Sequence, residues 1–173
     1  MALIKSVRGM TPRFGEGCYL ADNATVVGDV VMGDYCSVWF NAVVRGDVNS
    51  IRMGNKVNIQ DGAVLHCLYQ KSVVEIADNV SIGHNVIIHG ARISANVLVG
   101  MGATVMDHVE IGEHSIIAAG ALVLKDTKIE PGSIYAGVPA KRVKSVDPEQ
   151  TRDMIHRIAD NYIMYAGWYG EEG

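Results

Sequence analysis

The chain has 173 residues, of which 49% are apolar and 20% charged, and its net charge is −4. This length and composition are typical of one folded domain and exclude a disordered chain. Nucleic-acid binding depends on Lys and Arg, and a membrane-spanning helix needs roughly 18 consecutive apolar residues. Here Lys and Arg (15) are outnumbered by Asp and Glu (19), and no apolar run approaches that length, so we expect neither nucleic acid nor membrane among the partners.

The cysteines and the N-terminal residues indicate a reducing compartment. Residues 1–8 lack the long apolar stretch of a secretory signal. Cys18, Cys36 and Cys67 lie far apart, and an odd number of cysteines argues against a disulfide framework. We therefore expect a cytoplasmic protein.

Apolar residues recur at every sixth position through most of the chain. The count runs from Leu20 to Val44, resumes at Met53 after a slip of three residues, and continues from Ile76 to Tyr135 after an interruption at 67–75. A period of six suits neither a helix, with about 3.6 residues per turn, nor a long strand, with about 2.0. It indicates short strands separated by tight corners and coiled into a parallel β-helix, with the large aliphatic side chains stacked inside.

This period resembles the hexapeptide-repeat family over roughly residues 11–143. The resemblance implies an all-β fold: a left-handed parallel β-helix of triangular section, in which three hexads make one coil. We expect residues 1–146 to form this β-helix domain, including an N-terminal lead-in.

The C-terminal residues 147–173 follow a different pattern. Asp147 and Pro148 are a typical N-cap and first residue of a helix. Apolar and aromatic residues then recur at three- and four-residue spacing, at Ile155, Ile158, Tyr162, Tyr165 and Tyr169. We expect an α-helix that packs on the outside of the coil or on a neighbouring subunit and frays at Gly167 and Gly170.

Three histidines occupy special positions in the repeat. His66 follows Leu65 and His89 follows Ile88, one coil later. The two histidines therefore share one slot on adjacent coils, about 4.8 Å apart, from which both rings can bind one metal ion. His84 lies on the preceding face, so a third ligand from that face favours a site between two subunits of a three-membered ring.

The other histidines and Cys67 lack such neighbours. We interpret His108, His114 and His156 as ordinary surface residues. We interpret Cys67 as a small packed side chain at the start of a loop, because nothing completes a Cys/His zinc pattern there.

The motifs around these histidines resemble the γ-class carbonic anhydrase family. They are Arg45-Gly46-Asp47, Asn58-Ile59-Gln60-Asp61-Gly62, His66, and Gly83-His84-Asn85-Val86-Ile87-Ile88-His89-Gly90. The resemblance implies that His66, His84 and His89 are the metal ligands of a homotrimer, two from one subunit and the third from its neighbour. It also implies that Gln60 hydrogen-bonds the metal-bound hydroxide, and that Arg45, Asp47 and Asp61 form an ionic network across the interface near the metal. These four are the candidate catalytic residues, and a network that only holds the trimer together is the alternative for the last three.

The implied activity is the reversible hydration of CO2 to bicarbonate, with metal-bound hydroxide as the nucleophile. The metal is Zn²⁺ or Fe²⁺, since three imidazoles suit both. Two features of this sequence differ from the family pattern, and both concern the transfer of the proton to solvent. Val48 stands where well-studied members of the family have Glu, and the loop at 67–74 has no acidic residue. We therefore expect slow proton transfer to solvent.

Two alternative functions stay open at this point. One is a CoA-dependent acyltransferase or thioester hydrolase on the same fold, because residues 132–141 resemble the last coil of hexapeptide acyltransferases. The other is a non-catalytic, metal-stabilised trimer that serves as an assembly subunit, which the missing proton acids favour.

Overall fold

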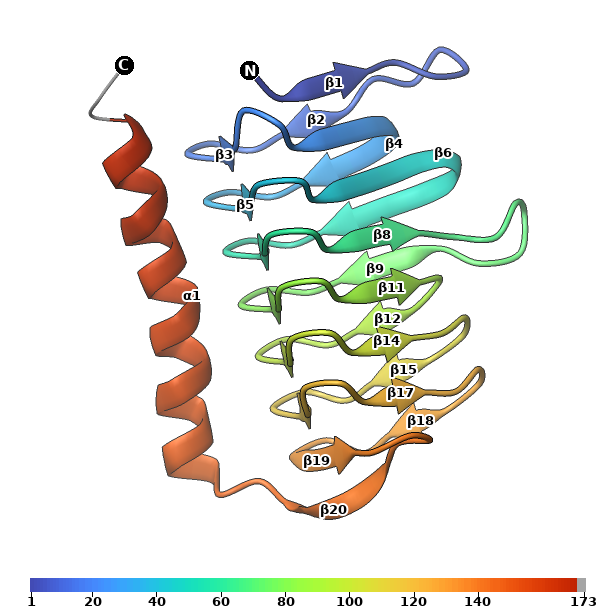
Figure 1. Ribbon diagram of the computed structural model, residues 1–173, viewed down its shortest axis with the longest axis vertical. Coiled ribbons are helices and arrows are strands. Elements are labelled where there is room, and N and C mark those ends of the chain that lie inside the picture. Colours follow the sequence, from blue (N-terminus) through green and yellow to red (C-terminus); the bar gives the residue numbers. More distant parts are fainter. Residues whose placement is uncertain (171–173) are drawn as a thin grey trace.

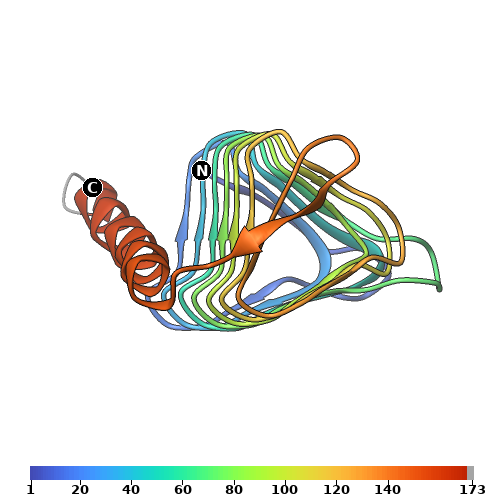
Figure 2. The same ribbon diagram turned by 90° about the horizontal axis from the view of Figure 1, so that it is seen from below.

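Short strands follow one another around the three faces of a triangular coil, and the coils stack along one axis (Figures 1 and 2). This computed structural model describes the backbone of residues 1–170 and the side chains of residues 1–147, 149 and 153–169. The predicted fold class, a left-handed parallel β-helix of hexapeptide repeats with a C-terminal α-helix, is confirmed.

We number the three faces in chain order. The first face consists of β1 (Leu3–Lys5), the first halves of β4 (Thr25–Met32) and β6 (Val43–Met53), β8 (Val64–His66), β11 (Ile87–His89), β14 (Thr104–Val105) and β17 (Leu122–Val123). The second face consists of β2 (Arg13–Phe14), the second halves of β4 and β6, β9 (Val74–Ile76), β12 (Arg92–Ile93), β15 (Glu110–Ile111) and β18 (Lys128–Ile129).

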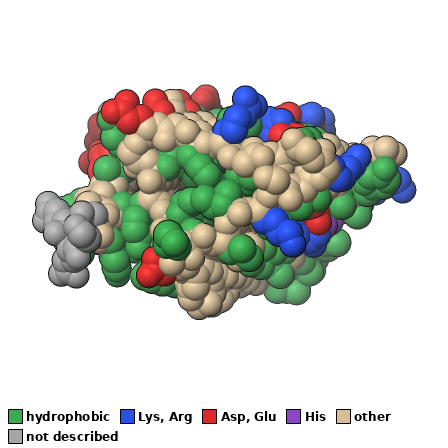
Figure 3. Space-filling view, turned by 90° about the horizontal axis from the view of Figure 1, so that it is seen from above, with side chains coloured by type: hydrophobic (Ala, Val, Ile, Leu, Met, Phe, Trp, Pro, Cys, Tyr) green, Lys and Arg blue, Asp and Glu red, His purple; other side chains and the backbone are tan. Residues whose placement is uncertain are grey.

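The third face consists of β3 (Tyr19–Leu20), β5 (Ser37–Val38), β7 (Asn58–Ile59), β10 (Ser81–Ile82), β13 (Leu98–Val99), β16 (Ile116–Ile117), β19 (Ser133–Ala136) and β20 (Lys141–Ser145). Neighbouring strands on all faces run parallel except β19 and β20, which are antiparallel. Leu3 and Ile4 of β1 are exposed at the N-terminal end of the stack, where hydrophobic side chains gather (Figure 3).

The aliphatic residue that heads each hexad points into the coil. From Val26 to Ile129 these side chains are at most 6% exposed, and Leu20 and Tyr135 at the two ends pack partly buried against the same core. Their stacking explains the period of six, because each face contributes one inward side chain per coil. The interior is therefore one continuous column of apolar side chains.

The slip in the repeat before Met53 has a structural cause. In β4 and β6 the chain runs from the first face to the second without a break, and Gly28 pairs with Gly46 whereas Val30 pairs with Ile51. The extra residues of β6 bulge outward at this corner. Gly28 has φ +76, and a Cβ there would collide with the backbone of Gly46.

Helix α1 (Pro148–Gly170) runs along the outside of its own coil (Figures 1 and 2). The amide of Glu149 donates to Asp147 Oδ1 at 3.1 Å, as expected of an N-cap. Ile155 and Ala159 are buried against the coil. The helix continues through Gly167 to Gly170, because its packing outweighs the low helix propensity of glycine; residues 171–173 lie outside the described residues.

His156 is not the ordinary surface residue that the sequence indicated. It is half-buried on α1, and its Nε2 is the one buried side-chain nitrogen or oxygen without a hydrogen-bond partner among the described residues. His108 and His114 instead occupy corners of the coil, where their φ angles are 59 and 57. Cys67 is 1% exposed, as expected of a packed side chain.

Among the described residues, no helix has the length and apolarity needed to cross a bilayer.

Candidate metal centre

His66 and His89 lie side by side at the corner between the first and second faces. They end β8 and β11, and the register of these two strands pairs His89 directly with His66. Their ring centroids are 5.3 Å apart, and His66 Nδ1 lies 3.2 Å from His89 Nε2. The repeat predicts this juxtaposition, because both histidines follow an inward residue at the same slot.

A carboxylate lies behind each of the two rings. His66 Nε2 is 3.2 Å from Asp47 Oδ1, and His89 Nδ1 is 2.9 Å from Asp107 Oδ2. Asp107 also accepts a hydrogen bond of 2.7 Å from the Ser72 hydroxyl. Histidines that bind metals usually donate their other ring N–H to a carboxylate, which fixes the orientation of the ring. Both rings therefore have the support that metal ligands need.

The charges at this corner favour neutral imidazole and ionised carboxylate. Burial, and secondly the positive charge of Arg45, lower the pKa of His66. Burial alone would raise the pKa of Asp47, but hydrogen bonds from Arg45 and His66 outweigh it and the pKa is lowered. The pKa of Asp107 is lowered in the same way, because hydrogen bonds from Ser72 and His89 outweigh burial. Neutral imidazole is the form of histidine that binds metals.

Arg45 belongs to the same corner. Val44 pairs with Leu65, so Arg45 occupies the slot next to His66 on the preceding coil. Its guanidinium donates to Asp47 Oδ2 at 2.7 Å. The structure thus brings Arg45, Asp47, His66 and His89 together within one chain.

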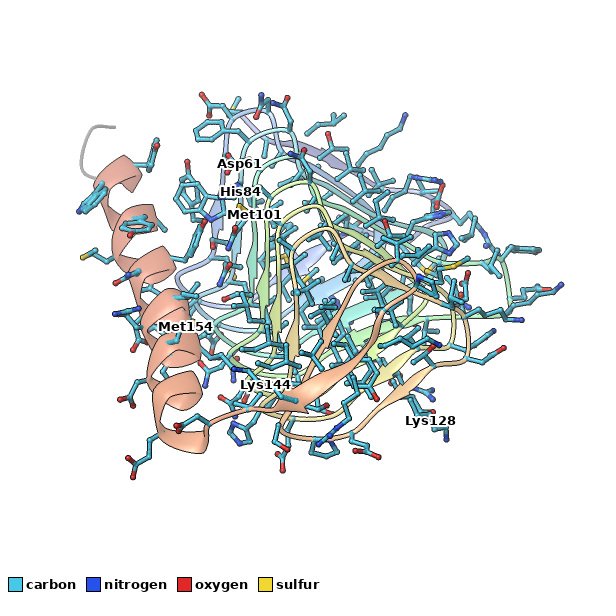
Figure 4. All side chains as sticks on the ribbon, turned by 60° about the horizontal axis from the view of Figure 1, so that its bottom comes forward. Asp61, His84, Met101, Lys128, Lys144 and Met154 are labelled. Carbon is cyan, nitrogen blue, oxygen red and sulfur yellow. The ribbon has the colours of Figure 1, made fainter. Side chains whose placement is uncertain are left out.

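His84 and Asp61 lie at a different corner, between the third face and the first. His84 Nδ1 is 2.8 Å from Asp61 Oδ2, and the two residues share one slot on adjacent coils. Figure 4 shows Asp61, His84 and Met101 one above the other on the side of the coil nearest α1. Both partners of this contact are about two-fifths exposed in the single chain, at 40% and 42%.

Gln60 is buried at the same corner as Asp61, with 5% of its surface exposed. Its amide nitrogen donates to Asn58 Oδ1 at 3.0 Å, and the Asn58 amide in turn donates to Ser81 Oγ at 2.8 Å. This chain of hydrogen bonds fixes the orientation of the Gln60 amide.

The predicted ligands thus divide into two groups at opposite ends of β11. His84 precedes this strand, at the corner where Asn85 has φ 57, and His89 ends it at the next corner. Among the described residues, no group of three or more His, Cys, Asp or Glu side chains is placed to hold a metal ion within one chain. A three-histidine site therefore requires a second copy of the chain.

The His66–His89 pair itself fits a metal ion. Two nitrogens bound at 2.0–2.1 Å to one tetrahedral ion lie about 3.3 Å apart, and the observed separation of the facing ring nitrogens is 3.2 Å. The donor set of two imidazoles, each with a carboxylate behind it, also suits zinc or iron(II).

Asp107 and Ser72 are functional residues that the sequence motifs do not indicate. Asp107 is separated from His89 by 18 positions in the chain and Ser72 from Asp107 by 35, so no local motif links them. The register of the repeat does, however, indicate the position of Asp107. Ile88 pairs with Val105, which places Asp107 at the slot beside Gly90 on the next coil. A carboxylate in that slot therefore lies one coil away from a candidate ligand.

The loop between β8 and β9 projects from this corner (Figure 2). Ser72 fixes the loop: its hydroxyl accepts from the Leu68 amide at 2.9 Å, and its carbonyl accepts from the Asn49 side chain at 2.8 Å. Tyr69 is 55% exposed, and the Arg8 guanidinium lies 5.7 Å from the centre of its ring. The loop contributes no carboxylate to the site.

Comparison with known proteins places this site in a family. The family described as "Bacterial transferase hexapeptide (six repeats)" matches residues 11–46 and 90–125. A Geobacillus kaustophilus protein named carbonic anhydrase is 41% identical over 167 residues, which are 96% of this chain and 91% of that protein. Gamma carbonic anhydrase 2, mitochondrial, of Arabidopsis thaliana is 36% identical over 174 residues, 98% of this chain and 62% of that protein's length.

A solved structure is similar over nearly the whole chain. The crystal structure of a hexapeptide transferase family protein from Anaplasma phagocytophilum has a TM-score of 0.90 and 34% identity, covering 96% of this chain and 98% of the other. The names of these relatives thus include both carbonic anhydrases and transferases. The extent and identity of the matches, together with the histidine motifs, show that the chain belongs to the γ-class carbonic anhydrase-like family of hexapeptide-repeat proteins.

Proposed function

We propose that this protein is an enzyme that catalyses the reversible, metal-dependent hydration of CO2 to bicarbonate. The observation that carries the proposal is the pair of adjacent imidazoles of His66 and His89, whose facing nitrogens are 3.2 Å apart and whose other nitrogens each meet a carboxylate. The matches to relatives named carbonic anhydrase support the same activity.

Each residue of the site has a role in this proposal. His66 and His89 of one subunit and His84 of a neighbouring copy would hold the metal, either Zn²⁺ or Fe²⁺. Such a metal would supply Lewis acidity that makes a water molecule nucleophilic near neutral pH. Asp47 and Asp107 hold the His66 and His89 rings in position.

Gln60 supplies a further hydrogen bond. Its amide nitrogen donates a hydrogen bond to Asn58. This bond orients the amide oxygen of Gln60 to accept a hydrogen bond from the attacking water. Asp61 holds His84 in the single chain. In the assembly we expect Arg45, Asp47 and Asp61 to form the ionic contacts between neighbouring copies.

A homotrimer with the site between subunits is part of the proposal. Val43, Val64 and Ile87 form a column of outward apolar side chains on the first face, and Ile87 is 43% exposed. This face lies between the corner that carries His66 and His89 and the corner that carries His84. A contact that joins one corner to the other is heterologous, and it closes into a ring when three copies associate.

The decisive experiment is metal analysis of anaerobically purified protein, followed by a CO2 hydration assay on the same sample. We expect about one metal ion per subunit and hydration that depends on it. His89→Asn should abolish both metal binding and hydration. His114→Asn is the matched control: it makes the same change at a corner with φ 57, which Asn accepts readily.

Two results would contradict the proposal. Metal-loaded protein without hydration at any buffer concentration would indicate the non-catalytic trimer or another substrate. Metal-independent turnover of an acyl-CoA would indicate a transferase instead, in which a histidine would act as a general base.

A further inference from the structure

Cys18 and Cys36 occupy the same slot on adjacent coils, at the corner between the second and third faces. Tyr19 pairs with Ser37 and Leu20 with Val38, so the preceding residues Cys18 and Cys36 also lie side by side. The Tyr19 amide donates to the Cys36 carbonyl at 2.9 Å. Parallel strands lie about 4.8 Å apart, and disulfides bridge Cα atoms separated by about 4.4–6.8 Å. The backbone thus already has the spacing of a disulfide.

The two thiols also point in the same direction. Cys18 Sγ donates to the Gly33 carbonyl at 3.1 Å, and Cys36 Sγ donates to the Gly54 carbonyl at 3.1 Å. Gly33 and Gly54 are themselves equivalent positions, each directly after a paired residue of β4 and β6. The side chains therefore stack one above the other, with sulfur next to sulfur.

The two cysteines differ in exposure and acidity. Cys36 is 1% exposed, whereas Cys18 is half-buried. A hydrogen bond from the Cys36 side chain lowers the pKa of Cys18 to about 7 despite partial burial. The hydrogen bond with Cys18, together with burial, raises the pKa of Cys36. Cys18 is thus the accessible, nucleophilic partner and Cys36 the protected one.

We propose that Cys18 and Cys36 form a thiol–disulfide exchange site that takes small-molecule disulfides such as oxidised glutathione and reversibly links the first two coils. The Cys18 thiolate, having released its proton to solvent, attacks one sulfur of the disulfide, and one glutathione thiolate leaves. Cys36 then attacks Cys18 Sγ in the mixed disulfide. A second glutathione leaves with the Cys36 proton, so two thiols are oxidised and one disulfide is reduced.

The site lies apart from the candidate metal centre. His66 and His89 occupy the corner between the first and second faces, and His84 occupies the corner between the third and the first. The cysteine pair lies at the remaining corner. We therefore expect oxidation to stabilise the N-terminal coils without changing metal content.

The repeat itself supplies a matched variant for the test. The slot of Cys36 is occupied by Ser115 four coils later, where the serine is fully buried and its hydroxyl donates to the Glu130 carbonyl at 3.0 Å. This bond is the equivalent of the one from Cys36 to Gly54. The variant Cys36→Ser can therefore fold and keep its hydrogen bond, while the second sulfur is removed.

The test exposes the folded, full-length protein to glutathione buffers of increasing oxidation, followed by acid quenching, alkylation and mass spectrometry. We expect the wild type to lose two thiols, to retain no glutathione and to yield a linked Cys18–Cys36 peptide. Dithiothreitol should reverse the change. The oxidised form should unfold at a higher temperature than the reduced form. Cys67→Ser should behave as the wild type, and Cys36→Ser should instead retain one glutathione on Cys18.

The proposal would be overturned by a wild type that retains glutathione on Cys18 without resolving it. It would equally be overturned if the wild type kept all its thiols while Cys36→Ser became modified. If neither protein reacted, Cys18 would not be an exchange site at all.

Discussion

At the scale of single residues, the carboxylates behind the histidines determine what the corner can bind. An imidazole binds a metal through one nitrogen, and the hydrogen bond at its other nitrogen sets its tautomer and orientation. Asp107 is 9% exposed and is itself held by the Ser72 hydroxyl. It therefore holds the His89 ring more firmly than a solvent-exposed carboxylate would.

We predict that Asp107→Asn weakens metal binding by about 10–100-fold, the usual cost of losing a supporting carboxylate. The neutral amide keeps the size of the side chain but loses the ionic hydrogen bond to His89. Competition with a chelator of known affinity measures the change. Asp126→Asn is the control, since Asp126 is exposed and contacts only Lys125 among the ion pairs described. Equal affinities of both variants and wild type would show that Asp107 does not support the site.

A second prediction concerns proton export. Val48 is half-buried beside Asp47, and the projecting loop has no acid before Glu75. Small buffers such as imidazole should therefore raise kcat with little change in kcat/KM, because that ratio reports the steps up to bicarbonate release. Val48→Glu should reduce the dependence on buffer, and Val48→Gln is the matched uncharged control. A high kcat that is indifferent to buffer in the wild type would show that another group carries the proton.

At the scale of elements, α1 is attached to the coil through its buried face and through an aromatic cluster. Ile155 and Ala159 are buried, and the Tyr162 and Tyr169 rings lie 5.3 and 5.7 Å from that of Trp39. Burial next to the coil, and secondly the charge of Asp61, raise the pKa of Tyr162 to about 12. The helix thus packs close to the corner that carries Asp61 and His84.

We predict that Ile155→Ala lowers the free energy of unfolding by about 2–5 kcal/mol, the usual cost of truncating a fully buried aliphatic side chain. Urea denaturation followed by tryptophan fluorescence measures it, since Trp39 lies in the cluster. Met164→Ala, at a 49% exposed position of the same helix, should change the stability little. Similar small effects for both variants would mean that the helix is not part of the cooperative unit.

At the scale of the whole molecule, the proposed metal site is divided between two corners of the coil. One corner carries two candidate ligands and another carries the third, and the first face with its apolar column lies between them. In the proposed trimer, the contact that completes the site would also cover this apolar surface. Metal binding and association should therefore stabilise each other.

Mixing two inactive variants tests this arrangement. Each mixed ring of His84→Ala and His66→Ala chains contains one interface where an intact His66–His89 pair faces an intact His84. Co-expressed with different tags and purified as mixed trimers, these chains should regain one metal site per trimer. The matched control mixes His66→Ala with His89→Ala, where no chain has both histidines, and should regain none. Mixed trimers of the first pair that bind no metal would contradict a shared site.

The sequence alone was sufficient to predict the coil and the two pairs of aligned residues in the candidate site. A period of six places one aliphatic side chain inside each face, so the alignment of His66 with His89 and of Asp61 with His84 followed from counting hexads. The corner from Gly46 to Ser50, where β6 carries extra residues, was visible only as a slip in the count. Close packing of Gly28 against Gly46 explains why the face is nevertheless preserved.

Only the tertiary structure decided which groups support the ligands and which side of the coil the helix covers. Asp107 contacts His89 from the next coil and Ser72 in turn donates to Asp107, each from a distant position in the chain, and a hexad count does not give side-chain direction at the corners. The position of α1 depends on aromatic packing against Trp39, and an amphipathic pattern identifies a buried face without identifying its partner. The backbone register of the repeat determines which periodic residues are neighbours. The neighbours of corner residues and of the helix depend instead on side-chain contacts.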